Sequence, residues 1–267
     1  MFNHREKIMN KSENPELKDK IALVTGASQG IGLEISKLFY SHGAKVIFAD
    51  LNEPKEEILQ NVCYKFIKTD LSNLNEAALL TSKALKEEGR IDILVNNAGI
   101  QNVHKAEEFD DLLWAKMIQI MLIAPFQISK RIIPSMKSQG FGRIINMSSI
   151  HGLVASPFKS AYNSAKHGLI GLTKTLALEL GEFGITVNAI CPGYVQTELV
   201  ESQITNQAKN YNMSKEDVIK DIMLSPAAIK KLIHPTEVAR IALFLASENS
   251  GSITGSSYSI DGGWTAR

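Results

Sequence analysis

Short apolar runs alternate with longer segments of helical period along most of this chain, and that alternation restricts its fold more than any other feature. The apolar runs, at residues 21–25, 45–49, 64–68, 91–95, 143–147, 186–190 and 257–260, are predicted strands. Predicted helices lie between them, at residues 31–42, 75–88, 114–138, 161–183 and 236–246. The predicted strands are largely apolar, as in a parallel sheet that is buried on both faces. The pattern predicts one α/β domain, a doubly wound parallel sheet of about seven strands with helices on both faces.

Two stretches do not follow this alternation. Residues 198–233 contain no predicted strand and two helix-like pieces, 200–210 and 215–222, shortly after a Pro192-Gly193 pair that can act as a hinge. An insertion of this length near the end of a sheet serves as a lid over a site or as an oligomer contact, and we favour the lid. Residues 1–18 are polar and of mixed charge, so we expect an N-terminal extension to a domain that covers residues 19–267.

The charges and cysteines argue against several classes of protein. Twenty-nine basic and 28 acidic side chains leave a net charge of +1, which gives no electrostatic footprint for nucleic acid or an anionic membrane. No window comes near the roughly 20 apolar residues of a membrane span, and residues 1–20 lack the apolar core of a signal peptide. Two distant cysteines, Cys63 and Cys191, favour reduced thiols. No Cys/His cluster has metal-ligand spacing, so we expect a cytoplasmic protein with no metal and no nucleic-acid or membrane partner.

A glycine-rich turn, TGASQGIG at residues 25–32, connects the first predicted strand to the first predicted helix. Its glycines allow a tight turn and let a pyrophosphate approach the free amides at the helix N-terminus. The spacing differs from GxGxxG, but the place between a strand and a helix near the chain start is the context that makes such a motif specific. The turn predicts a Rossmann-type dinucleotide site with contacts from Gly26, Ser28, Gln29, Gly30, Ile31 and Gly32.

Asp50 follows directly on the second predicted strand, eighteen residues beyond Gly32. A carboxylate at this position accepts hydrogen bonds from ribose hydroxyls and repels a 2′-phosphate. No arginine in the turn or directly after Asp50 offsets that repulsion. We therefore expect NAD rather than NADP as the cofactor.

Further motifs follow in order along the chain. They are Asp70-Leu71, Asn96-Asn97-Ala98-Gly99, Ser149 followed by Tyr162-x-x-x-Lys166, and Pro192-Gly193-Tyr194-Val195-Gln196-Thr197. With the glycine turn, these motifs make the chain resemble the short-chain dehydrogenase/reductase family from about residue 20 to the C-terminus. The resemblance implies further cofactor contacts from Asp70, Leu71, Asn97, Ala98, Gly99, Tyr162, Lys166, Pro192, Gly193, Val195 and Thr197.

The spacing of Tyr162 and Lys166 suits proton transfer. Residues four apart lie on one face of a helix, and a neighbouring ammonium lowers the pKa of a phenol from its reference value of about 10. The family resemblance implies that Tyr162 exchanges the alcohol proton while hydride passes between the same carbon and nicotinamide. It implies that Lys166 holds the ribose hydroxyls and lowers the pKa of Tyr162, and that Ser149 hydrogen-bonds the substrate oxygen.

One position departs from the family pattern. Many members have an asparagine on the long central helix, which supports a water-mediated proton relay from the lysine. Met121 stands at the matching position, and a thioether is at best a weak acceptor and no donor. We expect the relay to use main-chain carbonyls and water; a slower enzyme is the alternative.

Charged and amide side chains near Ser149 and Tyr162 indicate the substrate. His151 and Lys159 suit charge-assisted hydrogen bonds to a carboxylate, and Gln101 and Gln203 can add neutral donors. With segments 191–194, 199–201 and 261–266, these residues resemble the D-3-hydroxybutyrate dehydrogenases, a subfamily in which matching residues hold the substrate carboxylate and the tryptophan at Trp264 lines the pocket. Tyr194 replaces a tryptophan common in that subfamily and keeps an aromatic wall. The resemblance implies NAD-dependent interconversion of D-3-hydroxybutyrate and acetoacetate.

Alternatives remain open at this point. A reductase of 3-oxoacyl thioesters or a general secondary-alcohol dehydrogenase would not need His151 and Lys159 to face inward. A non-catalytic nucleotide-sensing protein could retain the fold, although only Met121 favours it. The helix at 161–180 is apolar around much of its circumference, so it lies in the core or at a subunit interface. The family resemblance implies a homotetramer.

Overall fold

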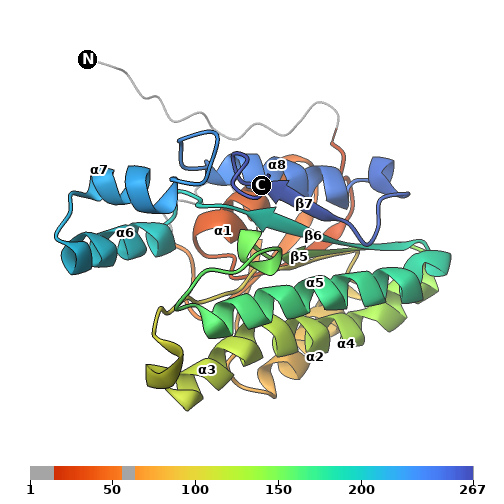
Figure 1. Ribbon diagram of the computed structural model, residues 1–267. Coiled ribbons are helices and arrows are strands. Elements are labelled where there is room, and N and C mark those ends of the chain that lie inside the picture. Colours follow the sequence, from red (N-terminus) through yellow and green to blue (C-terminus); the bar gives the residue numbers. More distant parts are fainter. Residues whose placement is uncertain (1–14, 56–63, 267) are drawn as a thin grey trace.

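The computed structural model describes residues 15–55 and 64–266 (Figure 1). Most of the predicted N-terminal extension, and Cys63, therefore lie outside the described residues. Leu17 belongs to the predicted extension but is fully buried in the main core, packed with residues of the first helix and strand. The part of the chain that packs into the core therefore begins before residue 19, the predicted start of the domain.

Seven strands form one parallel sheet in the order β3-β2-β1-β4-β5-β6-β7. Their bounds are β1 (Ile21–Thr25), β2 (Lys45–Asp50), β3 (Tyr64–Lys68), β4 (Ile93–Asn96), β5 (Gly142–Met147), β6 (Ile185–Pro192) and β7 (Ser257–Ile260). The strand order reverses between β1 and β4, and in such sheets ligands bind at the carboxyl ends of the strands beside the reversal. This confirms the predicted doubly wound α/β fold and indicates where its site should lie.

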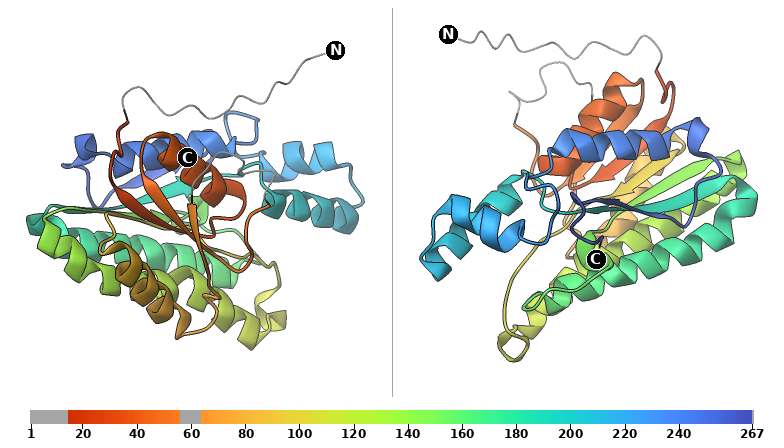
Figure 2. Two further views of the ribbon diagram at one scale, coloured as in Figure 1. Left: turned by 180° about the vertical axis from the view of Figure 1, so that it is seen from behind. Right: turned by 45° about the horizontal axis from the view of Figure 1, so that its top comes forward.

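Helices cover both faces of the sheet (Figures 1 and 2). On one face α1 (Gly30–Ser41) and α8 (Pro235–Ala246) pack on residues such as Val24 and Phe48. On the other, α2 (Glu76–Glu88), α4 (Ala124–Gln139) and α5 (Ser160–Leu180) pack on residues such as Leu23 and Ile47. Successive strand side chains point to opposite faces, so a buried strand needs apolar residues at every position.

The helix predicted at 114–138 is longer and less regular than expected. It consists of α3 (Asp111–Ile118), a π-helical turn (Gln119–Ile123) and α4. By length and composition this run could cross a membrane, contrary to the sequence expectation that no segment comes near that threshold. In the fold, 44% of its most apolar window is buried, with Met117, Ile128 and Ile132 inside the core. A helix in the core of a globular domain can reach the same length and hydropathy.

The segment at 198–233 forms a small helical unit that projects beside the carboxyl end of β6 (Figure 1). It contains α6 (Glu198–Tyr211) and α7 (Lys215–Asp217), which continues into a π-helical turn (Val218–Met223). Its own apolar core is formed by Val200, Ile204, Val218, Met223 and Leu224. A bridge between Val195 and Ile233 brings the two ends of the segment together. The two predicted helical pieces are confirmed.

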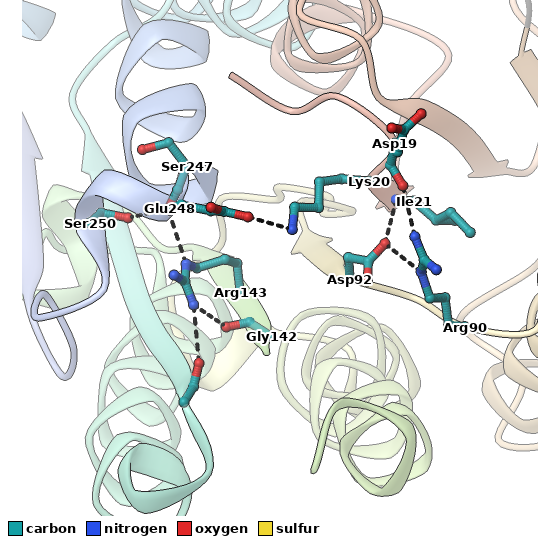
Figure 3. A network of polar contacts seen from close by, with 11 residues as sticks. Asp19, Lys20, Ile21, Arg90, Asp92, Gly142, Arg143, Ser247, Glu248 and Ser250 are labelled. Carbon is teal, nitrogen blue, oxygen red and sulfur yellow. Dashed lines mark hydrogen bonds and ion pairs between the residues drawn. The ribbon is translucent and has the colours of Figure 1, made fainter. Parts of the chain in front are cut away.

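The amino ends of the strands are joined by charged side chains (Figure 3). The Asp92 carboxylate accepts hydrogen bonds from the Ile21 amide at 2.7 Å and from the Arg90 guanidinium at 3.2 Å. Arg143 is buried and donates to the carbonyl oxygens of Ser247, at 3.2 Å, and of Gly184, at 3.2 Å. Arg143 thus connects β5 to the chain after α8 and to the chain before β6.

Replacing this guanidinium should destabilise the fold. We expect Arg143→Met to lower the free energy of unfolding by about 2–4 kcal/mol, because buried carbonyl oxygens lose their donors. Equilibrium unfolding in urea measures the loss. Glu248→Gln, which removes the partly exposed ion pair with Lys20, is the control and should cost less than about 1 kcal/mol. Equal losses in the two variants would contradict the importance of the buried contacts.

Candidate functional site

A cavity of about 350 Å³ opens at the carboxyl ends of the strands beside the β1–β4 reversal. Most of the predicted site residues line it. They are Gly26, Gln29, Gly30, Ile31, Asp50, Asp70, Leu71, Asn97, Ala98, Gly99, Gln101, Ser149, His151, Lys159, Tyr162, Lys166, Pro192, Gly193, Tyr194, Val195, Thr197 and Gln203. Three predicted site residues do not line it: Ser28, Gly32 and Trp264.

The glycine turn is fixed to the loop after β4. Asn97 donates its side-chain amide to the carbonyl oxygens of Thr25, at 3.0 Å, and Gly26, at 2.9 Å. Gly26 has a φ of +63°, which favours glycine. A Cβ on Gly32 would lie 2.0 Å from the Gly26 carbonyl oxygen, so Gly32 serves the close approach of helix and turn rather than the cavity. Sequence spacing could not separate these two roles.

The first helix leaves its N-terminus available to an anion. Gln29 precedes α1 and makes no side-chain cap, so the first-turn amides have no side-chain acceptor. Asp50 lies on the cavity wall beside this turn and accepts hydrogen bonds from the Ser28 amide at 2.9 Å and the Leu51 amide at 2.7 Å. Ser28 therefore acts through its backbone on Asp50, while its hydroxyl donates to the Asn52 carbonyl at 2.5 Å.

Ser149, Tyr162 and Lys166 meet on the floor of the cavity. Burial raises the pKa of Tyr162, and a hydrogen bond with Ser149 acts in the opposite direction. Burial lowers the pKa of Lys166 to about 8. Its ammonium donates to the Met147 carbonyl oxygen at 2.6 Å and lies 5.5 Å from the centre of the Tyr162 ring. Without a ligand, the phenol is protonated at neutral pH and stands beside a titratable lysine.

A second polar group lies next to this floor. The Lys159 ammonium is 3.2 Å from His151 Nε2 and donates to the Tyr194 hydroxyl at 3.5 Å. Burial lowers the pKa of His151 to about 3, with a further contribution from the Lys159 charge, and lowers the pKa of Lys159 to about 8. The imidazole is therefore neutral, and its Nε2 accepts from the ammonium. Within residues 15–55 and 64–266, no acidic side chain forms an ion pair with Lys159.

Two glutamines join the segment 198–233 to the loop after β4. Gln203, on α6, donates its amide to Gln101 Oε1 at 3.0 Å. The Gln101 amide nitrogen is buried and makes no hydrogen bond to any described residue, and neither does Gln203 Oε1. The Gln101 amide is thus an unused donor and Gln203 Oε1 an unused acceptor, and both residues line the cavity.

Trp264 does not line the cavity, contrary to the expectation from the subfamily. Its ring lies edge-on to His151, with 6.0 Å between ring centres, and Tyr162 lies edge-on to the same imidazole at 6.1 Å. The indole N–H donates to the Met223 carbonyl in the segment 198–233 at 3.3 Å. Trp264 therefore packs against His151 and connects the C-terminal turn to this segment. No local pattern in the sequence could have indicated these two long-range contacts.

A buried chain of polar side chains, which the sequence patterns did not indicate, lies behind the floor of the cavity. Asn96 donates to Asn146 Oδ1 at 2.8 Å, and Asn146 donates to Thr173 Oγ1 at 2.9 Å. The chain connects β4 and β5 to α5, the helix that carries Tyr162 and Lys166. An asparagine in the middle of an apolar strand, as in the GRIINM run of β5, was the available signal.

Met121 is buried in the π-helical turn and packs near Gly99. It belongs to the apolar core on that face of the sheet. The Lys166 ammonium instead bonds a main-chain carbonyl, that of Met147. This contact is compatible with a relay that uses main-chain oxygens.

The cavity lies where the strand order reverses, and an uncapped helix N-terminus and a Tyr–Lys pair adjoin it. This arrangement defines a nicotinamide-dependent oxidoreductase. The profile of the short chain dehydrogenase family matches residues 20–208. The chain is 44% identical over 256 residues to the D-beta-hydroxybutyrate dehydrogenase of Rhizobium meliloti, an alignment that covers 93% of this chain and 99% of that protein. It is 40% identical over 257 residues to the enzyme of the same name from Cupriavidus necator, covering 94% and 100% of the two chains.

A solved structure shares the fold. The ligand-free aldohexose dehydrogenase of Thermoplasma acidophilum superposes with a TM-score of 0.86 at 33% identity, covering 95% of this chain and 96% of that one. The chain belongs to the short-chain dehydrogenase family.

Proposed function

We propose that this enzyme interconverts D-3-hydroxybutyrate and acetoacetate with NAD as its cofactor. The observation that carries the proposal is the buried Lys159 ammonium, which faces a cavity and whose partners among the described residues, His151 and Tyr194, are both neutral. Removing a charge from water without a counter-ion is costly, so the site favours an anionic ligand. The name shared by two relatives supports the choice of acid and of its D enantiomer.

The surrounding donors suit a carboxylate. Lys159 offers a charge-assisted hydrogen bond, and the unused Gln101 amide offers a second, neutral one. Gln203 places the second amide on α6, together with Leu199 and Val200 on the cavity wall. This supports a lid role for residues 198–233, which would close over the acid.

Residues of the chain fit a dinucleotide along the rest of the cavity. The free amides at the start of α1 suit a pyrophosphate, and the Asp50 carboxylate suits ribose hydroxyls while opposing a 2′-phosphate. Lys166 would hold the second ribose. When bound, NAD supplies the hydride acceptor and a positively charged ring.

In this proposal Tyr162 takes the proton of the substrate hydroxyl as the adjacent carbon loses hydride. Ser149 donates a hydrogen bond to the same oxygen and holds it in place. Lys166 stabilises the phenolate of Tyr162, offsetting the burial that raises the pKa of this phenol. The proton then leaves through Lys166 and water that main-chain oxygens such as that of Met147 would hold in place.

We further propose a cytoplasmic homotetramer. Leu178 on α5 is 87% exposed and Phe126 on α4 is 45% exposed, so two neighbouring helices present apolar side chains. Two glycines of α5 differ in their surroundings: Gly168 packs against Leu122, while Gly171 has open space around it. This outer face supports a subunit contact.

Tyr162→Phe tests the catalytic role. We expect kcat for D-3-hydroxybutyrate to fall by about 10²–10⁴-fold, because the proton acceptor is lost. The absorbance of the NADH that forms measures the rate. The dissociation constant of NADH should change little, and a variant that retains near-normal kcat would contradict the mechanism.

Asp50→Ser tests the choice of cofactor. The wild type should favour NAD, and the variant should lower the ratio of kcat/KM for NAD over NADP by roughly tenfold or more, because a like-charge contact is removed. Glu53→Gln, a carboxylate change close in sequence but outside the cavity wall, is the matched control. A wild type that prefers NADP would refute the assignment.

Lys159→Met tests the carboxylate site. KM for 3-hydroxybutyrate should rise by about 10–100-fold, because a charged hydrogen bond is lost. KM for the neutral methyl ester should change much less.

The same lysine predicts a dependence of KM on pH. The pKa of Lys159 is lowered to about 8, so the ammonium is present below this pH and lost above it. KM of the wild type should therefore rise as pH increases through this value, and the variant should lack that rise. Lys105→Met, at an exposed position, is the control; equal effects on acid and ester would argue against a carboxylate site.

A further inference from the structure

Tyr194 connects the lid segment with the polar group around Lys159. Its ring packs against the apolar core of the lid, which includes Val200 and Ile204. Its carbonyl oxygen accepts the Ile233 amide at 2.9 Å, at the point where the lid segment returns to the sheet. Its hydroxyl reaches Lys159, which immediately precedes α5. The tyrosine therefore spans from the lid to the catalytic helix, and it lines the cavity between them.

The hydrogen bond between Lys159 and Tyr194 has a fixed direction. An ammonium has three donors and no acceptor, so the phenol oxygen accepts. The phenol proton must then point elsewhere, and the described part of the chain provides no acceptor for it. Burial raises the pKa of Tyr194 to about 12, so the hydroxyl keeps its proton over the working pH range.

The same reasoning applies to the ammonium itself. His151 Nε2, at 3.2 Å, and the Tyr194 oxygen, at 3.5 Å, account for two of its three N–H groups. Among residues 15–55 and 64–266, one N–H of Lys159 and the O–H of Tyr194 are left without acceptors at neighbouring points of one cavity wall. Two donors so placed suit the two oxygens, or the two lone pairs of one oxygen, of a single carboxylate.

We propose that Tyr194 is a specificity-determining residue whose phenol donates a hydrogen bond to the substrate carboxylate held by Lys159. This rests on the proposed function and adds to it a donor from the lid side of the cleft. The substrate class is therefore a short hydroxy acid whose carboxylate bridges the lid and the catalytic helix. The aromatic ring alone would form an apolar wall and would not distinguish an acid from a neutral alcohol of similar size.

Tyr194→Phe tests the proposal because it removes one oxygen and keeps the ring in the lid core. We measure kcat/KM for 3-hydroxybutyrate and for its methyl ester with saturating NAD. The acid-to-ester ratio should fall by about 10–100-fold, as for a lost hydrogen bond to a charged acceptor. Tyr258→Phe, the same change on β7 away from the cavity wall, is the matched control and should leave the ratio at the wild-type value. A ratio in Tyr194→Phe equal to that of the control overturns the proposal.

A double variant separates direct donation from support of Lys159. If Tyr194 bonds the carboxylate itself, adding Tyr194→Phe to Lys159→Met should lower kcat/KM for the acid further. If it only positions the ammonium, the second change should have no effect in that background, and the proposal is overturned. Failure of the proposed function looks different: the wild type would not prefer the acid, and Lys159→Met alone would leave the acid-to-ester ratio unchanged.

Discussion

The hydrogen bonds between the end of β1 and the loop after β4 fix the geometry on which the cleft depends. Thr25 Oγ1 accepts the amides of Asn97 and Ala98 at 3.0 and 3.1 Å, and the Asn97 side chain returns two hydrogen bonds to the turn. These contacts hold together the two loops that leave β1 and β4, where the strand order reverses. The glycine turn, the start of α1 and the loop that leads to Gln101 then take their positions from one rigid junction.

Charge is distributed unevenly along the resulting cleft. Of its acidic groups, Asp50 ends β2, Asp70 follows β3 and Glu198 begins α6, while its lysines, Lys159 and Lys166, lie around α5. Burial lowers the pKa of both lysines to about 8, so the protein holds cations that have lost hydration and gain most from an anionic or phenolate partner. In the proposed function, this polarity favours one orientation of the dinucleotide and one end of the acid.

Much of the fold could be predicted because strands and helices here are defined by local patterns. The predicted strands at 21–25, 64–68 and 257–260 agree with β1, β3 and β7, and the other elements differ by a few residues at their ends. Most of the predicted site residues line one cavity, and many of these follow the carboxyl ends of strands, which meet at one edge of a parallel sheet. What the sequence could not provide were contacts between distant segments, such as Trp264 with Met223, Asn96 with Asn146, and Arg143 with Ser247. These depend on packing, and no spacing along the chain encodes them.

The C-terminal turn has a consequence for handling the enzyme. Asp261 closes the turn by accepting from Gly263, at 2.9 Å, and Thr265, at 3.0 Å, and the Gly262 carbonyl accepts the amides of Ala228 and Ile229. The last described residues are thus bonded to the segment 198–233, which also carries Gln203 on α6. In the proposed function, a purification tag, a fusion partner or a surface linkage attached at this end would pull on that segment and disturb recognition of the acid before it disturbed the dinucleotide cleft.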